Sequence, residues 1–355
     1  MPTAVATKTK KAVKPRKPVT RKPAKRVTKA AIKPGSAKTK SHDASDLKIT
    51  KIDTSYQGMN LQLPWTESPF FKQILEKSGL DSETKKLVQA YSDDGFVVVD
   101  LDIPNFDTLA QNIQNLFDKD NPPRRIHDAF AFSEDARMLA AHPKIMDLLQ
   151  LLYQREPIPF QTLNFLYGTE QGTHSDAIHF YCYPERFMCG VWIALEDIDE
   201  TNGALHYYPG SHKLPVYDMA TLGVVGSDYM LEGREEEINM TEYKKYEQLV
   251  QALMEAQGFE KKHLYVPKGK ALVWSANLFH GGDAISDNTR TRLSQVTHYY
   301  FDQCTYYTPM LSDPYMDEGR IRWRDIYNIA TQKEVKQYYC GREVKHTVRN
   351  KETKW

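Results

Sequence analysis

From Pro159 onward the sequence consists of short apolar or alternating runs separated by turn residues, and this pattern constrains the fold more than any other feature. The runs cover residues 160–167, 189–195, 204–208, 264–266, 271–274 and 293–301. Runs of this length between turn residues are typical of strands in a sandwich or barrel. We therefore expect a mainly β core over about 156–302, with flanking helices.

The segment before this core, about 65–155, has a helical period instead. Asp81 is placed to cap a helix that Gly95 ends, ahead of a buried strand at 96–99. Asn105 is the predicted cap of a second helix, and residues 143–154 form a third. The apolar positions of the first two helices are Leu87, Val88 and Tyr91, followed by Leu109, Ile113, Leu116 and Phe117.

Two further segments interrupt or follow the β pattern. Residues 241–257 have helical spacing with Gly258 as a stop, so we read about 214–262 as an insertion over one mouth of the sheet. The insertion would be either a lid or a segment that only packs against the sheet. The aromatic-rich residues 303–355 would cover the core, so that 46–355 form one domain.

Charge is divided sharply along the chain. Residues 1–40 contain fourteen of the 47 Lys and Arg residues and no Asp or Glu, which leaves 33 basic against 46 acidic side chains, a net of −13, in the other 315 residues. Residues 1–45 lack aromatic side chains and are rich in proline, so we expect them to be disordered. Such a tail would bind nucleic acid or another polyanion, or it would serve as a solubilising arm.

Cysteine usage and hydropathy indicate the compartment. The four cysteines show no CxxC spacing, and no apolar run reaches the length of a membrane span. We therefore expect no membrane span and a cytoplasmic protein, with nuclear or nucleoid association as the alternative.

Two short motifs place metal-ligating residue types about a hundred residues apart. His174 and Asp176 stand two residues apart in a strand-like segment, so both side chains would leave one face of the sheet. His280 directly follows another strand-like run and offers a second imidazole. Two histidines and one carboxylate form the facial triad that holds Fe(II) and leaves positions open for reactants.

The residues between these motifs carry a family resemblance. Three motifs follow His174 and Asp176 in order and precede the distal histidine and an arginine. They are Trp192-Ile193-Ala194-Leu195-Glu196-Asp197, Asn202-Gly203-Ala204-Leu205 and Pro209-Gly210-Ser211-His212-Lys213. With the Asp94-Gly95-Phe96 opening, this order resembles the phytanoyl-CoA dioxygenase family of Fe(II)- and 2-oxoglutarate-dependent oxygenases. The resemblance covers about 83–302, without the tail, the insertion or the segment after 303.

This resemblance implies a double-stranded β-helix, which is a jelly-roll or cupin-like core, and the cofactors Fe(II), 2-oxoglutarate and O2. It implies that His174, Asp176 and His280 hold the iron, and that an arginine after the distal histidine binds the far carboxylate of 2-oxoglutarate. Arg290 and Arg292 both fit; they share strand parity, and counting back from the strand end favours Arg292.

The other residues near the motifs are less specific. Phe180 and Trp192 are candidates for the substrate pocket, although core packing is the stronger explanation for them. His179 has the opposite strand parity to His174 and should point away from the metal, and His206, His212 and His298 fit turn or core positions.

The function expected from the resemblance is a dioxygenase that hydroxylates a C–H bond of a small-molecule or acyl-type substrate and releases succinate and CO2. One alternative is an oxygenase that is tethered to nucleic acid by its basic tail and modifies either the nucleic acid or a protein bound to it. The acidic body opposes this alternative by repelling phosphates. Another is a non-catalytic barrel.

Overall fold

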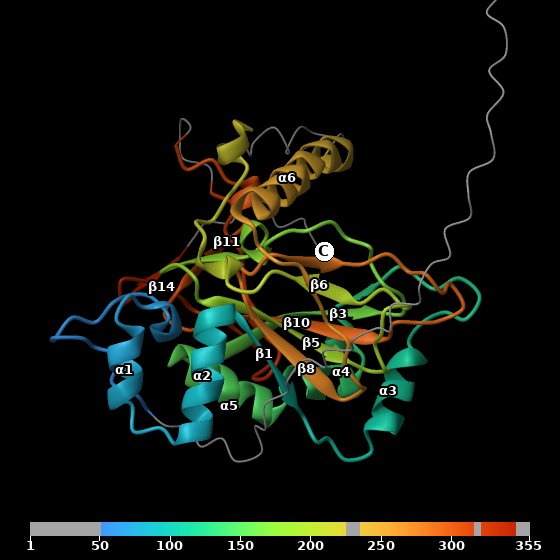
Figure 1. Cartoon of the computed structure of the whole chain (residues 1–355), viewed down its shortest axis with the longest axis horizontal. Coiled ribbons are helices and arrows are strands. Elements are labelled where there is room, and N and C mark those ends of the chain that lie inside the picture. Colours follow the sequence, from blue (N-terminus) through green and yellow to red (C-terminus); the bar gives the residue numbers. More distant parts are fainter. Residues whose placement is uncertain (1–50, 225–234, 316–320, 346–355) are drawn as a thin grey trace, which may run out of the picture. The chain divides into compact units, whose positions relative to one another are not determined.

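A six-stranded antiparallel sheet lies at the centre of the computed structural model, which describes residues 51–224, 235–315 and 321–345 (Figure 1). Its strands, in spatial order, are β1 (Phe96–Asp100), β8 (Lys270–Ser275), β5 (Met188–Ala194), β10 (Ser294–Phe301), β3 (Pro157–Phe165) and β2 (Ile126–His127). A second sheet orders β7 (Lys262–His263), β6 (Leu205–Tyr207) and β9 (His280–Gly282). The predicted tail lies outside the described residues, so its disorder and its binding role stay predictions.

The two sheets enclose an inner apolar core. Side chains from both sheets or beside them meet in it, namely Val98, Trp192, Leu272 and Trp274 from the large sheet, Leu205 and Tyr207 from the small one, and Leu264 and Val266 after β7. Two antiparallel sheets packed face to face on a shared core are the arrangement of a jelly roll. The chain therefore has the predicted mainly β fold, a double-stranded β-helix with flanking helices.

Helices cover the other face of the large sheet. They are α1 (Phe71–Lys77), α2 (Ser82–Asp94), α3 (Phe106–Gln114), α4 (Glu134–Ala140) and α5 (Pro143–Tyr153). Val97 and Val99 of β1 pack with apolar side chains of α2 and α5, while Val98 points into the inner core. Because the strand is buried on both faces, its sequence reads as an unbroken apolar run.

The helix boundaries confirm some predictions and correct others. The Asp81 carboxylate accepts hydrogen bonds from the backbone of Glu83 and Thr84, and Gly95 ends α2 with a φ of 81°. Asn105 does not cap α3 through its side chain, because its φ of 56° lies outside the extended conformation that capping requires. The same helix ends at Gln114, so Leu116 and Phe117 lie in the turn after it.

The predicted strand at 264–266 is displaced. The ladder of β7 ends at His263. The N–H of Leu264 still donates to the carbonyl of Leu205 in β6, and Val266 forms an isolated bridge with Ile198. Leu264 and Val266 both lie in the inner core, so these apolar positions were predicted correctly, although the strand β7 ends before them.

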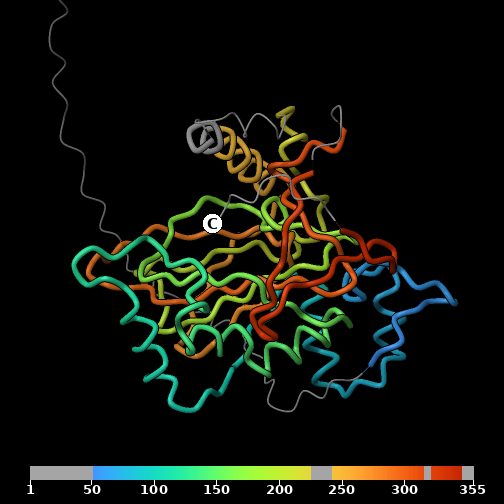
Figure 2. The backbone as a smooth tube through the Cα atoms, turned by 180° about the vertical axis from the view of Figure 1, so that it is seen from behind, coloured from blue at the N-terminus to red at the C-terminus, as the bar shows by residue number. Residues whose placement is uncertain are grey.

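The insertion helix α6 (Glu235–Gln257) lies across one end of the barrel (Figures 1 and 2). Its described apolar side chains, Tyr243, Tyr246, Val250 and Met254, pack with Ile178, Tyr208, Met219 and Phe279 in a separate cluster. Among the described residues, no helix is both long and apolar enough to cross a membrane.

The chain after β10 forms three small sheets. β11 (Thr305–Tyr307) pairs with β4 (Tyr181–Tyr183), β12 (Tyr327–Asn328) with β13 (Lys333–Glu334), and β14 (Gln337–Tyr339) with β15 (Arg342–Val344). Through the first pair, this segment lies beside the residues that follow the His174 and Asp176 motif.

Candidate metal centre

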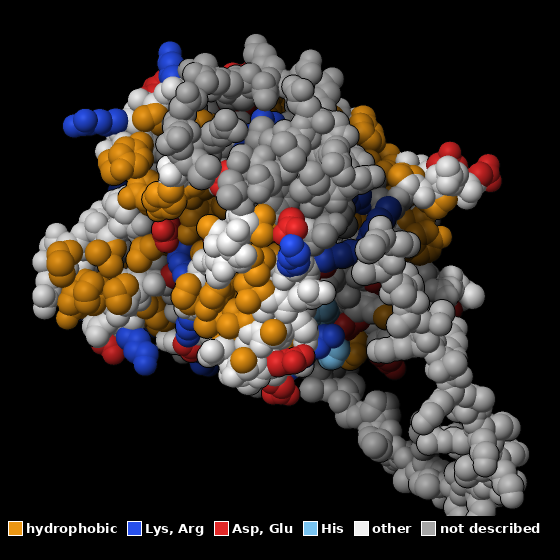
Figure 3. Space-filling view, turned by 90° about the horizontal axis from the view of Figure 1, so that it is seen from above, with side chains coloured by type: hydrophobic (Ala, Val, Ile, Leu, Met, Phe, Trp, Pro, Cys, Tyr) orange, Lys and Arg blue, Asp and Glu red, His pale blue; other side chains and the backbone are white. Residues whose placement is uncertain are grey.

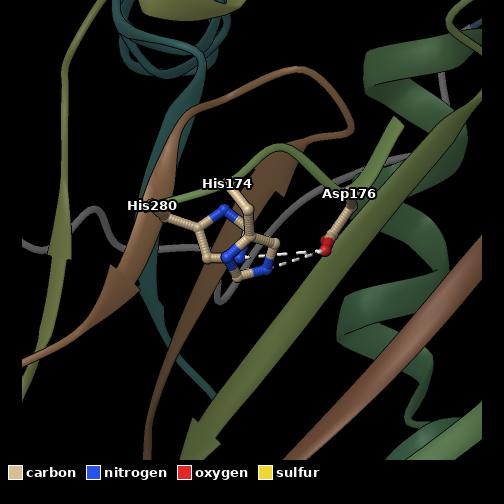
Figure 4. Close-up of side chains that lie close together, drawn as sticks. All are labelled: His174, Asp176 and His280. Atoms are coloured by element: carbon tan, nitrogen blue, oxygen red, sulfur yellow. Dashed lines mark ion pairs between the residues drawn. The ribbon is translucent and has the colours of Figure 1, made fainter. Parts of the chain in front are cut away.

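His174 and His280 lie side by side although about a hundred residues separate them. The backbone N–H of each donates to the carbonyl of the other at 2.9 Å, which forms an isolated antiparallel bridge. Residues paired in this way project their side chains to the same face. The two imidazole rings are accordingly 4.6 Å apart between centroids (Figure 4).

The hydrogen bonds of the two rings determine which nitrogen is available. His174 Nδ1 lies 2.9 Å from the carbonyl of Gly172, and His280 Nδ1 lies 2.9 Å from the carbonyl of Leu278. Since a carbonyl only accepts, each Nδ1 carries the hydrogen and each Nε2 keeps its lone pair. Both rings are thus set to bind a cation through Nε2.

Asp176 completes the group from a different local structure than predicted. The segment is no strand at this residue: Asp176 begins a 3-10 helix, η3 (Asp176–Ile178). The reason is the hydroxyl of Ser175, which accepts from the N–H of Ala177 and contacts the Asn277 amide oxygen at 3.0 Å, and which thereby turns the chain. The side chains of His174 and Asp176 converge because of this turn and not because of strand alternation.

The two oxygens of the Asp176 carboxylate have different surroundings. Its Oδ1 lies 3.7 Å from His174 Nε2 and 3.8 Å from His280 Nε2 (Figure 4). Its Oδ2 accepts a 2.8 Å hydrogen bond from Trp274 Nε1. Potential ligand atoms of the three residues all lie within 4.8 Å of one another. A Cβ at Gly190 would stand 2.2 Å from the Trp274 ring, so only glycine leaves room for this indole.

Burial decides the charge of the site. His174, Asp176 and His280 are all less than a tenth exposed. Burial lowers the pKa of His174 to about 4, with a further contribution from His280, and burial also lowers the pKa of His280 to about 4. Both imidazoles are therefore neutral at pH 7, and a buried carboxylate facing two neutral nitrogens is an environment that a divalent cation would stabilise.

Comparison with known proteins identifies the family. A family model described as phytanoyl-CoA dioxygenase (PhyH) matches residues 91–292, more than half of the sequence. The chain belongs to the phytanoyl-CoA dioxygenase family.

Curated relatives and solved structures give weaker matches. The chain is 31% identical over 90 residues to phytanoyl-CoA dioxygenase domain-containing protein 1 of Danio rerio, and 32% identical over 90 residues to that of Mus musculus. Each match covers 24% of this chain and 31% of the relative, so the chain spans about a third of the length of the curated relatives it matches.

Two solved structures also resemble the chain. The α-ketoglutarate-dependent epimerase SnoN of nogalamycin biosynthesis is 20% identical with a TM-score of 0.48. That match covers 62% of this chain and 84% of the epimerase. EctD from S. alaskensis with bound Fe is 19% identical with a TM-score of 0.46, over 62% of this chain and 77% of EctD.

The two arginines that the family resemblance left open occupy different environments. Arg290 donates to the Asp199 carboxylate and to Thr201 Oγ1, and its side chain is about a third exposed. Arg292 is 1% exposed, and its Nε and Nη1 have no hydrogen-bond partner among the described residues. Burial lowers the pKa of Arg292 to about 10, which still leaves a buried cation at pH 7.

The two pocket candidates have different neighbours. Trp192 is 1% exposed and stands 5.9 Å from the Arg292 guanidinium, and its Nε1 also lacks a partner among the described residues. Phe180 is half-buried, and its ring lies 4.6 Å from that of His298. That both line a substrate pocket stays a prediction.

His298 lies closer to the centre than sequence reasoning predicted. Its Nε2 is 3.8 Å from Asp176 Oδ2, and its Nδ1 is 3.1 Å from Gln161 Oε1. The alternation that turns Val296 into the inner core also turns His298 inward, so strand parity was the available signal. His179 stands 6.2 Å from the His174 ring and lies outside the metal-binding group among the described residues.

Proposed function

We propose that the protein is an Fe(II)- and 2-oxoglutarate-dependent dioxygenase that hydroxylates a C–H bond of a small-molecule or acyl-type substrate. The observation that carries this proposal is the convergence of His174, Asp176 and His280 in a buried site, where Nδ1 of each imidazole donates to a backbone carbonyl and each Nε2 keeps a lone pair. Two imidazoles and one carboxylate fit Fe(II) and leave positions for reactants. Bound Fe(II), 2-oxoglutarate and O2 would supply an oxidant for the C–H bond, with succinate and CO2 as co-products.

Arg292 is the proposed anchor for the far carboxylate of 2-oxoglutarate. A buried guanidinium with unpaired N–H groups needs an anion, and the planar fork of arginine matches a carboxylate with two parallel hydrogen bonds. Arg290 already has the Asp199 carboxylate as its partner. Trp192 lies beside Arg292 and its Nε1 has no hydrogen-bond partner among the described residues. This position favours a contact of Trp192 with 2-oxoglutarate over a contact with the substrate.

The protein's own residues would prepare the reaction in two ways. Gly172 and Leu278 fix the orientation of the two imidazoles through their carbonyls, and Trp274 fixes the carboxylate. The inner core and α6 exclude water from the metal's surroundings, which strengthens each electrostatic contact in the site.

An anaerobic absorption titration of the full chain tests the proposal. Fe(II) with 2-oxoglutarate should give a weak visible charge-transfer band, and the band should be absent in His280→Ala. Arg292→Met should weaken 2-oxoglutarate binding by about thirtyfold or more, which corresponds to about 2 kcal/mol for a buried charge pair. The matched control, Arg290→Met, should stay within about threefold of wild type, as expected for an exposed ion pair.

A folded, iron-loaded protein without this band would contradict the proposal and favour the non-catalytic barrel. The nucleic-acid alternative draws on residues outside the described part of the chain. On the described part of the face that carries α6, acidic and basic side chains are intermixed rather than gathered into a field of one sign (Figure 3). This arrangement does not favour binding of a phosphate backbone.

A further inference from the structure

A chain of polar side chains leads from the proposed metal ligand His174 to the insertion helix. Gln171 Nε2 lies 3.3 Å from His174 Nε2 and 3.2 Å from the hydroxyl of Tyr243. The same hydroxyl is 3.1 Å from His179 Nε2. Tyr243 belongs to α6 and is 9% exposed, so this contact is part of the packing of the helix on the barrel.

The direction of these hydrogen bonds follows from the chemistry of the groups. His174 Nε2 is an acceptor because Nδ1 carries the ring hydrogen, so the amide of Gln171 donates to it. An amide nitrogen has two hydrogens, and the second is directed to the Tyr243 oxygen. The backbone of Gln171 is held as well, since its carbonyl accepts from the N–H of Gly282 at 3.0 Å.

A metal on His174 Nε2 would take the lone pair to which Gln171 now donates. That N–H would then lose its acceptor while Tyr243 still holds the amide in place. We propose that Gln171 is a ligand-binding residue, and that its freed N–H donates to an oxygen ligand of the metal that the chain does not supply. Tyr243 is the positioning residue that orients it.

This inference rests on the proposed function and names two sources for the oxygen, namely 2-oxoglutarate and water. A lost donor is worth about 0.5–1.5 kcal/mol, which corresponds to roughly two- to tenfold in affinity. The inference also gives α6 a role in the site, because the inserted helix supplies the residue that fixes the amide.

Three variants of the full chain test the inference under anaerobic conditions. Gln171→Met keeps the side-chain length without the donor, and Tyr243→Phe removes only the positioning hydroxyl. The control is Gln251→Met on the same helix as Tyr243, because it removes an amide donor that is paired with the exposed Glu255 carboxylate, away from the metal ligands. One arm measures the affinity of the Fe(II) protein for 2-oxoglutarate, and the other records the visible spectrum of the Co(II) protein without 2-oxoglutarate.

If 2-oxoglutarate is the acceptor, Gln171→Met weakens its binding two- to tenfold and shifts the charge-transfer band. Tyr243→Phe should weaken binding less, and the control Gln251→Met should not change it. The double variant Gln171→Met with Tyr243→Phe should bind no more weakly than Gln171→Met alone. If water is the acceptor, Gln171→Met changes the visible spectrum of the Co(II) protein and leaves the affinity for 2-oxoglutarate unchanged. Unaltered affinity and spectrum in Gln171→Met would overturn the inference.

The two proposals fail separately. Absence of any 2-oxoglutarate band in the wild-type protein counts against the proposed function, whereas the Co(II) spectrum still reports whether Gln171 acts on the metal's water ligand. Melting curves of all variants establish that each is folded, so that a change in the spectrum is assigned to the site.

Discussion

The indole of Trp274 is expected to raise metal affinity without contacting the metal. Its Nε1 donates a 2.8 Å hydrogen bond to Asp176 Oδ2 in a buried setting, which leaves Oδ1 directed at the two imidazoles. Trp274→Phe keeps an aromatic ring and removes the donor. A hydrogen bond to a charged group is worth about 1.5–3 kcal/mol, and residues that orient metal ligands typically contribute about 10- to 100-fold in metal affinity.

We therefore expect Trp274→Phe to bind Fe(II) or Co(II) about 10- to 100-fold more weakly in anaerobic competition with a chelator. Trp65→Phe is the matched control, because it also removes a buried indole hydrogen bond, the 2.9 Å contact from Nε1 to the Leu151 carbonyl. The control should lose stability by about 1 kcal/mol and keep its metal affinity. Equal metal affinity in Trp274→Phe and wild type would refute the reasoning.

Three further predictions concern pH, packing and capping. Burial lowers the pKa of His174 and His280 from 6.5 to about 4, so between these pH values the unfolded chain binds more protons than the native one. The metal-free protein should therefore lose stability, measured by urea titration, as the pH falls from about 6.5 to about 4. A flat urea midpoint over this range would contradict that assignment. Gly190→Ala should lower the free energy of unfolding by about 1–3 kcal/mol, since a Cβ would overlap the Trp274 ring; an unchanged melting temperature would exclude the overlap. Asp81→Ala should cost about 1 kcal/mol in the same assay through loss of the α2 cap, with no change in metal affinity.

Local patterns in the sequence predicted most of the elements. The strand run at 96–99, the helix at 143–154 and the inserted helix at 241–257 match β1, α5 and most of α6. These predictions succeeded because apolar periodicity reports the face that a single element buries. Asn105 shows the limit, since the sequence gives the residue type of a cap but not the backbone angle that determines whether the side chain reaches.

The candidate site was identified for a partly wrong reason. His174, Asp176 and His280 do converge, but the contacts of Ser175 with residues 276 and 277 replace the expected strand with a turn. Those partners lie about a hundred residues away, so no local pattern reveals them. His298 is a different case, because it was assigned to turns or core although the parity of its strand pointed its side chain inward, toward Asp176.

What the sequence determined by itself is the inventory of side chains and their local periodicity, including the three ligand types and an arginine after the distal histidine. Which arginine is available was decided by tertiary structure alone. Arg290 and Arg292 have the same parity and the same chemistry, but the turn that carries Asp199 reaches Arg290, while Arg292 is enclosed beside Trp192 with no hydrogen-bond partner for its Nε and Nη1 among the described residues. The physical reason is that the energy of a charge depends on its solvent and its partners, and distant parts of the chain supply both only after folding.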